Sequence, residues 1–131
     1  MTVLKKAAVA LAAPALLVAL SGTAVAEEPV SAADFTNCPA NYGCFYTGAN
    51  GTGAKCQWTS NNHQHADACS WGGDTNVRSI ANRKSSYLCF YRLPDYDKSE
   101  QWGWVIPNGQ GNLAGNYKVL SHRWVSSPSN C

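Results

Sequence analysis

The chain has 131 residues, which is enough for one small domain and too few for two sizeable cores. Its net charge of +2 comes from Lys5 and Lys6 alone, because the remaining eight of the 10 Lys and Arg residues balance the eight Asp and Glu residues. Without that pair the surface is neutral, which excludes the basic stripe that nucleic-acid binding requires.

Residues 1–26 have the order of an export signal. Two lysines precede an apolar run over residues 7–20, which is shorter than the roughly 20 residues that span a bilayer and contains Pro14. The segment ends in Ala24-Val25-Ala26, the small-residue pattern that signal peptidase requires. We therefore predict cleavage before Glu27, a secreted extracellular product, and no membrane attachment afterwards.

Residues 27–37 are rich in alanine, serine and acidic side chains without periodicity, so we expect a flexible tail there. The folded domain is expected over residues 38–131. No stretch of a dozen residues in it has apolar positions at helical spacing, which excludes long helices. Short runs rich in aromatic and β-branched residues predict the strands of an all-β antiparallel sandwich or barrel: 42–46, 56–58, 76–80, 87–91, 101–106 and 117–125.

All six cysteines follow the predicted cleavage site: Cys38, Cys44, Cys56, Cys69, Cys89 and Cys131. An even number in an exported domain predicts three disulfides, of which 15 pairings are conceivable. We expect Cys38 to pair with Cys44, since they can close a short loop around Pro39. No Cys-x-x-Cys pair exists, which argues against a zinc ribbon and leaves no metal or other cofactor predicted.

Three short patterns recur in the same order within the domain. Cys44-Phe45-Tyr46 returns 45 residues later, Gln57-Trp58 returns 44 later as Gln101-Trp102, and the Val-x-Ser of residues 77–79 returns 42 later. Such a repeat predicts two copies of one supersecondary unit, arranged as two Greek keys packed as a small sandwich. The side chains expected between the sheets are Phe45, Phe90, Val77, Val119 and several of the tryptophans.

The segment from Cys38 to Ala54 closely resembles the opening of the secreted bacterial metalloproteinase inhibitors, a peptidase-inhibitor family with a β/γ-crystallin-type fold. Cys38, Cys44 and Tyr46 match the family pattern Cys-Pro-x-x-x-x-Cys-x-Tyr position by position, and in the family the two cysteines are bridged. The resemblance implies a monomeric inhibitor that blocks the active site of a thermolysin-like extracellular protease with a disulfide-held loop, and it implies no enzyme activity.

The later cysteines depart from the family pattern, because Cys56, Cys69, Cys89 and Cys131 are 13 or more residues apart. The inhibitory loop is therefore unassigned by the resemblance. If Cys56 pairs with Cys69, the enclosed segment 57–68 becomes the best-tethered exposed loop. The alternative function is a cell-wall or carbohydrate-binding module without inhibitory activity, in which tryptophans such as Trp102 and Trp104 stack on sugar rings.

Two further patterns have weaker functional interpretations. Residues 74–79 and 116–121 resemble degenerate calcium-binding segments of microbial β/γ-crystallins, but Arg78 and Leu120 stand where a ligand is needed, so we expect them to stabilise a turn. His63, His65, Asp67 and Cys69 alternate and would share one face of an extended strand, yet a disulfide would remove Cys69, and we expect a solvated loop. Trp102 and Trp104 also share a strand face, which we expect to be core.

Overall fold

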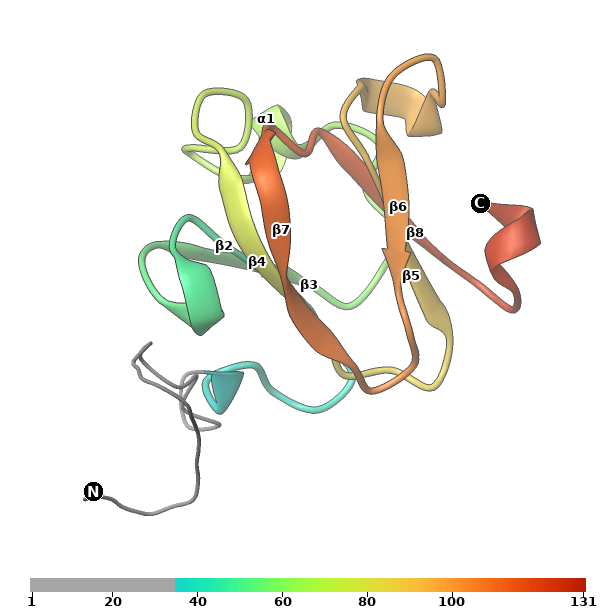
Figure 1. The fold of residues 1–131 in the computed structure, drawn as a ribbon, viewed down its shortest axis with the longest axis horizontal. Helices are drawn as coiled ribbons and strands as arrows, with labels where there is room; N and C mark the ends of the chain where they lie inside the picture. Colours follow the sequence, from blue (N-terminus) through green and yellow to red (C-terminus); the bar gives the residue numbers. More distant parts are fainter. Residues whose placement is uncertain (1–34) are drawn as a thin grey trace, which may run out of the picture. The chain divides into compact units, whose positions relative to one another are not determined.

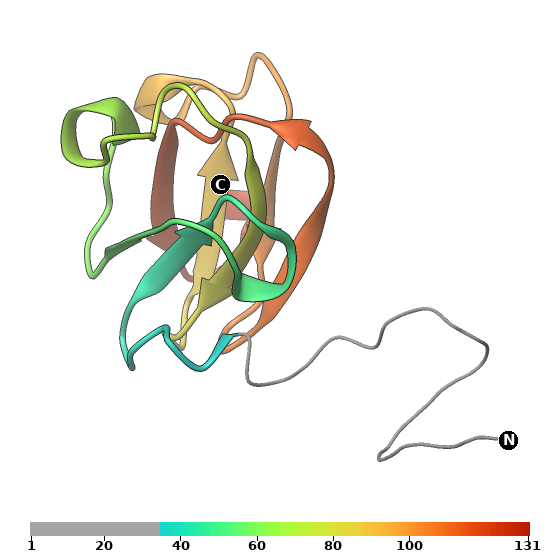
Figure 2. The ribbon, with the colours of Figure 1, turned by 90° about the vertical axis from the view of Figure 1, so that its left-hand side faces the viewer.

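The computed structural model describes residues 35–131, which form two antiparallel sheets packed against each other (Figures 1 and 2). The first sheet has the strand order β3-β2-β4-β7, and the second has the order β6-β5-β8. The strands of the first sheet are β3 (Lys55–Trp58), β2 (Gly43–Tyr46), β4 (Val77–Asn82) and β7 (Gln110–Tyr117). Those of the second are β6 (Trp102–Val105), β5 (Tyr87–Tyr91) and β8 (Ser121–Val125). The signal-peptide prediction lies outside the described residues.

The strand order shows two interlocked Greek keys, which confirms the predicted architecture. The second motif supplies β5, β6 and β8 to its own sheet but sends β7 across to pair with β4 of the first motif. The reciprocal exchange from the first motif is reduced to an isolated bridge between Asn62 and His122 of β8. The segment that contains Asn62 thus takes the place of a fourth strand of the second sheet.

The sequence-based strand prediction is wrong at β7. Its sequence, Gln-Gly-Asn-Leu-Ala-Gly-Asn-Tyr, is poor in strand-forming side chains, and we expected one strand over residues 117–125 instead. In the structure Tyr117 ends β7 and Ser121 begins β8. Pairing with β4 along an edge of the sheet, rather than local propensity, holds β7 extended.

Helices are few and short in residues 35–131. The α-helix α1 (His65–Ala68) has four residues, and the 3-10 helices η2 (Ala49–Gly51), η3 (Pro94–Tyr96) and η4 (Pro128–Asn130) have three each. None of the helices in this part of the chain has the length and apolar character needed to cross a membrane.

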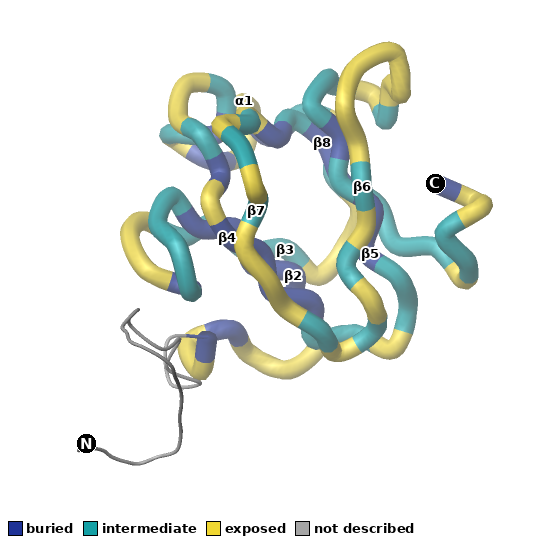
Figure 3. The backbone as a smooth tube through the Cα atoms, viewed as in Figure 1, coloured by how far each residue is buried: buried dark blue, intermediate teal, exposed yellow. Residues whose placement is uncertain are grey.

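The main core lies between the sheets and takes residues from both. Figure 3 shows buried stretches along strands of both sheets. Its fully buried members are Phe45, Val77, Ile80, Leu88 and Val119, and three of these were predicted from the repeat. Phe90, also predicted to be core, packs against them as a half-buried side chain. Burying a large apolar side chain contributes about 1.5–3 kcal/mol, so this cluster is the largest apolar contribution to the fold.

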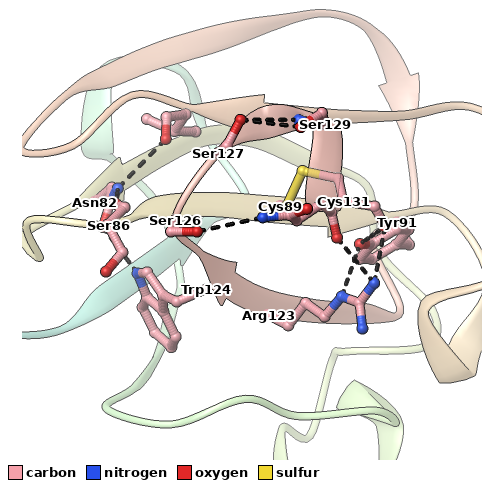
Figure 4. The surroundings of a disulfide bond; sticks show 12 residues. Asn82, Ser86, Cys89, Tyr91, Arg123, Trp124, Ser126, Ser127, Ser129 and Cys131 are labelled. Atoms are coloured by element: carbon pink, nitrogen blue, oxygen red, sulfur yellow. Dashed lines mark hydrogen bonds between the residues drawn. A yellow bond between two sulfur atoms is a disulfide. The ribbon is translucent and has the colours of Figure 1, made fainter.

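Each end of the described chain folds onto the outer face of one sheet and is fixed there by a disulfide. Cys38–Cys44 ties residues 35–42 to the first sheet, and Cys89–Cys131 ties the C-terminus to the second. The repeat is visible in the tyrosines, because the Tyr46 hydroxyl donates to Asn37 Oδ1 at 2.7 Å and the Tyr91 hydroxyl donates to the Cys131 carbonyl at the same distance. The bond of Tyr91 lies beside the Cys89–Cys131 disulfide (Figure 4).

The flexible tail was predicted to extend to residue 37, but the structure is already folded at Phe35. Phe35 is buried and its ring packs edge-on against Tyr46, with ring centroids 5.9 Å apart. An aromatic side chain near the end of an otherwise polar segment was the signal that the tail prediction overlooked. Residues 35–37 therefore belong to the folded domain.

One of the three repeated patterns is not a structural repeat. In the first motif Cys44 lies opposite Gln57 and Gly43 opposite Trp58, whereas in the second Cys89 lies opposite Trp104. The counterpart of Trp58 is therefore Val105, three residues beyond Trp102. Because three residues is an odd shift, the two tryptophans point to opposite faces of their sheets.

Candidate functional site

The loop between β3 and α1 is closed by the second disulfide, Cys56–Cys69, whose Cα atoms are 6.1 Å apart. It contains an exposed stretch, Thr59–Asn61, and a second exposed stretch on the helix, Ala66–Ala68. This pairing makes residues 57–68 the disulfide-enclosed segment that the sequence left as a hypothesis.

Hydrogen bonds to strand β8 fix the exposed stretch of the loop and the residue that follows it. The backbones of Asn62 and His122 exchange two hydrogen bonds, of 3.1 Å and 2.9 Å. The Asn61 side chain accepts a hydrogen bond from the Trp124 backbone N–H at 2.9 Å, and the His122 ring contacts the Ser60 carbonyl at 2.9 Å. Three successive loop residues are thereby fixed against one strand, so the stretch has little freedom left to lose on binding.

A buried pair of histidines joins the far end of the loop to the same strand. His65 Nε2 lies 2.7 Å from His122 Nδ1, and neither side chain is more than 2% exposed. The His65 ring stacks on Trp58 at 4.2 Å between centroids and meets Phe45 edge-on at 5.0 Å. His65 thus enters the core from the loop.

The hydrogen bonds determine which nitrogens carry protons. His122 Nε2 faces the Ser60 carbonyl, an acceptor, so that nitrogen is protonated and donates. In the neutral ring His122 Nδ1 is then an acceptor, and His65 Nε2–H donates to it. Desolvation lowers the pKa of His65 to about 3, with repulsion from His122 acting in the same direction, and desolvation lowers the pKa of His122 to about 4. Both rings are neutral at neutral pH.

The loop also contacts the second motif through the neighbouring hairpin. The Asp95 backbone N–H donates to the His63 carbonyl at 2.8 Å, and His63 Nδ1 lies 2.9 Å from the Asp95 carboxylate. These two side chains are 67% and 76% exposed, so their attraction is screened by water and contributes little. The backbone bond is the firmer attachment.

The four alternating side chains considered as metal ligands do not share a face. The segment is helical rather than extended from His65 onward, which buries His65, while Cys69 is disulfide-bonded and His63 is paired with Asp95. Among residues 35–131 no group of three or more His, Cys, Asp and Glu side chains is placed to hold a metal ion.

The two segments considered as degenerate calcium sites contain matched serines that hold hairpins closed. Ser79 Oγ accepts from the Gly51 N–H at 2.9 Å and donates to the Gly48 carbonyl at 2.7 Å. Ser121 Oγ accepts from the Tyr96 N–H at 3.1 Å and donates to the Leu93 carbonyl at 2.7 Å. Both serines are fully buried, so each satisfies two backbone groups that would otherwise lack partners.

The expectation that Trp102 and Trp104 are core is wrong. They lie on the outer side of edge strand β6, 38% and 47% exposed, next to the 60%-exposed Ile106. Their rings are 6.0 Å apart, and Lys98 lies over the Trp102 ring at 4.7 Å. Trp102 and Trp104 do share one face of the strand, as predicted, but it is the outer face. The inward-facing positions of β6 are taken by Gly103 and Val105.

Sequence reasoning raised the segment between Cys56 and Cys69 as a hypothesis but missed the histidine pair. Nothing local links His65 to His122, which are 57 residues apart, and both occur in polar sequence that predicts solvent exposure. The repeat was the available signal, since it placed His122 next to Ser121 at a position equivalent to the buried Ile80.

Comparison with known proteins identifies both a family and a fold. The model of peptidase inhibitor family I36 matches residues 31–106. That range includes the first motif, the Cys56–Cys69 loop and strands β5 and β6. No curated protein sequence matches the chain.

Solved structures of low identity share the fold. A chain from a study of the evolution of the eye lens β/γ-crystallin domain fold aligns with a TM-score of 0.59 at 13% identity, covering 70% of this chain and 93% of that one. Spherulin 3a from Physarum polycephalum aligns at 0.52 and 15%, covering 70% and 90%. A β/γ-crystallin from an archaeon aligns at 0.51 and 20%, covering 66% and 100%. These structures establish the β/γ-crystallin fold.

Proposed function

Because the chain belongs to peptidase inhibitor family I36, we propose that it is a secreted, monomeric inhibitor that inserts the Cys56–Cys69 loop into the active site of an extracellular metalloprotease of the thermolysin type. The family is one of inhibitors rather than enzymes. The metalloprotease target is supported by the close resemblance of residues 38–54 to the bacterial metalloproteinase inhibitors.

The observation that carries this proposal is the way the loop is held around its exposed stretch Thr59–Asn61. A disulfide closes the loop, β8 binds its backbone, and His65 anchors its far side in the core. A loop that is already ordered pays little entropy on entering a cleft. After cleavage its ends would remain in place, which favours re-formation of the bond over release of product.

The exposed stretch and the residues beside it are uncharged, as we expect of a segment that binds in the cleft like a neutral substrate. Residues 57–62 are Gln-Trp-Thr-Ser-Asn-Asn and include no ionisable side chain. The side chains of Thr59 and Ser60 are both exposed. They are therefore the side chains we assign to contact with the protease.

Titration of the secreted, oxidised protein against a thermolysin-type metalloprotease and a serine protease tests the proposal. We expect stoichiometric inhibition of the metalloprotease and at least tenfold weaker inhibition by Thr59→Arg and Ser60→Arg, because a bulky cation would obstruct the cleft. Ser85→Arg, at an exposed turn between β4 and β5, is the matched control and should inhibit like the wild type.

Full inhibition by both loop variants would show that the inhibitory site lies elsewhere on the domain. Inhibition of the serine protease alone would overturn the target assignment. A carbohydrate-binding function is favoured by one observation, the exposure of Trp102 and Trp104, and retention on insoluble cell-wall glycans without inhibition of either protease would establish it in place of the inhibitor.

A further inference from the structure

An open socket lies between the free edges of the two sheets on the side of the second motif. It has a volume of about 260 Å³ and is bounded by β6, which pairs only with β5 among the described strands, and by β7, which pairs only with β4. Its apolar lining comes mainly from Ile80, Phe90, Val105 and Leu113. An apolar cavity of about 150 Å³ already accepts a benzene molecule, so this socket has room for an aromatic ring.

The internal repeat shows how the molecule fills the corresponding place in its first motif. The strand registers and the matched serines make Phe90 the counterpart of Phe45, Val105 that of Trp58, and Ile80 that of His122. In the first motif Phe45, Trp58 and His122 surround the His65 ring, at centroid distances of 5.0, 4.2 and 4.9 Å respectively. The socket is thus the symmetry-related equivalent of an occupied ring-binding site.

Two glycines explain why the second site is empty of side chains. Gly103 takes the place of Cys56, so no disulfide draws a loop over the opening, and an added Cβ there would meet the Phe90 ring at 2.8 Å. Gly111 pairs with Ile80 and so faces the same side of the sheet, and a Cβ added to it would meet no atom within 4 Å. Gly103 thus leaves room for the Phe90 ring to lie against β6, and the missing side chain of Gly111 keeps the socket open.

From this equivalence we infer that the socket binds an aromatic side chain presented by an extended, uncharged segment of a partner polypeptide. Ile80 replaces His122, so the ring needs no polar partner, and none of the nine lining residues is charged, which suits an uncharged segment. Strand β6, with the sequence Trp-Gly-Trp-Val, pairs with no described strand on its second edge and has neither the charge nor the proline that blocks pairing, and of its carbonyls that of Val105 accepts a hydrogen bond from Asn82 Nδ2 at 3.3 Å. The exposed Trp104 and Ile106 border the opening and extend the apolar contact.

This site is separate from the proposed inhibitory loop. The loop is attached to β8, whereas β6 is the opposite edge of the same sheet. The inference therefore stands whether or not the loop inhibits a protease.

Nuclear magnetic resonance titration of the full, exported and oxidised protein tests the inference. The probes are a blocked pentapeptide with a central phenylalanine flanked by serine and threonine, the same peptide with a central serine, and N-acetylphenylalaninamide. We expect the phenylalanine peptide to shift the amides of Ile80, Phe90, Val105 and Leu113 and to bind at least tenfold more tightly than either other probe.

Gly111→Leu is the blocking variant, since its side chain has open space and would occupy the socket. We expect it to keep the wild-type fold and to lose peptide binding at least tenfold. Ala114→Leu adds the same side chain at an exposed position of the same strand and should bind like the wild type.

Equal binding of the phenylalanine and serine peptides would overturn the inference, as would unchanged binding by Gly111→Leu. Tight binding of N-acetylphenylalaninamide would show that the socket recognises a small molecule rather than a polypeptide, which contradicts the inference. Concentration-dependent shifts at the same amides without any probe would show that a second copy of the chain occupies the socket, which also contradicts the inference.

Discussion

At the scale of single residues, the buried histidine pair makes the folded state sensitive to acid. The pKa values of about 3 for His65 and about 4 for His122 lie below the ordinary value of 6.5, so the unfolded chain binds more protons than the folded chain between these limits. Stability is therefore fully present above about pH 6.5 and decreases as the pH falls towards 4. Each histidine contributes about 1.4 kcal/mol per pH unit within that window.

His65→Phe should roughly halve this pH dependence. The phenyl ring fills the place between Phe45 and Trp58 but does not titrate, which leaves His122 as the remaining contributor. Urea unfolding at intervals from pH 7 to pH 4 measures the slope. His63→Phe, at a side chain 67% exposed, is the control and should keep the wild-type slope, and a flat wild-type profile would contradict the prediction.

At the scale of elements, register determines which tryptophans support the fold. Trp58 faces the core and packs on Phe45 and His65, whereas Trp104 lies on the outer face of β6. We expect Trp58→Thr, at a half-buried side chain that packs against the core, to lower the free energy of unfolding by about 1–3 kcal/mol, and Trp104→Thr to change it by less than about 1 kcal/mol.

Chemical denaturation of the two variants, with threonine chosen to preserve strand propensity, distinguishes the faces. Equal losses would mean that the register assigned to β6 is wrong. Near-ultraviolet circular dichroism gives an independent measure, because the Trp58 indole, which packs on Phe45 and His65, should contribute more to the tertiary signal than the exposed Trp104 indole.

The elements that sequence could predict are those whose own side chains favour a strand. Strand β5, Tyr87–Tyr91, was predicted with its observed bounds, because its aromatic and aliphatic residues favour a strand wherever they lie. Strand β7 was missed because pairing with β4 orders a glycine- and asparagine-rich segment that has no such preference. Similarly, the cysteine positions allowed the Cys56–Cys69 tether of the candidate loop only as one of several pairings, and the attachment of the loop to β8 depends on contacts about 60 residues apart.

At the scale of the whole molecule, the repeat explains both the symmetry and its departures. The matched tyrosines and serines keep the two motifs alike where the hairpins and the terminal segments are fixed. The motifs differ where β3 and β6 lead onward, since Cys56 closes one side of the sandwich and Gly103 leaves the other open. The proposed inhibitory loop and the proposed ring-binding socket thus both depend on one position of the repeat, which is Cys56 in the first motif and Gly103 in the second.

The three disulfides should contribute to stability in the order of the chain length that each encloses. Sequence separations of 6, 13 and 42 residues correspond to about 2, 3 and 4 kcal/mol from restriction of the unfolded chain, for Cys38–Cys44, Cys56–Cys69 and Cys89–Cys131 respectively. Paired Cys→Ala variants measured by urea unfolding at neutral pH test this order.

Inhibition should follow a different order from stability across the same three variants. Removal of the Cys56–Cys69 bridge has the middle effect on unfolding, yet it frees the stretch that we assign to the protease and should weaken inhibition most. Removal of Cys89–Cys131 destabilises the chain most but leaves the loop attached to β8, so inhibition measured well below the unfolding temperature should be nearly unchanged. If inhibition instead falls in proportion to lost stability, the bridge acts on the whole fold and the loop needs no special tether.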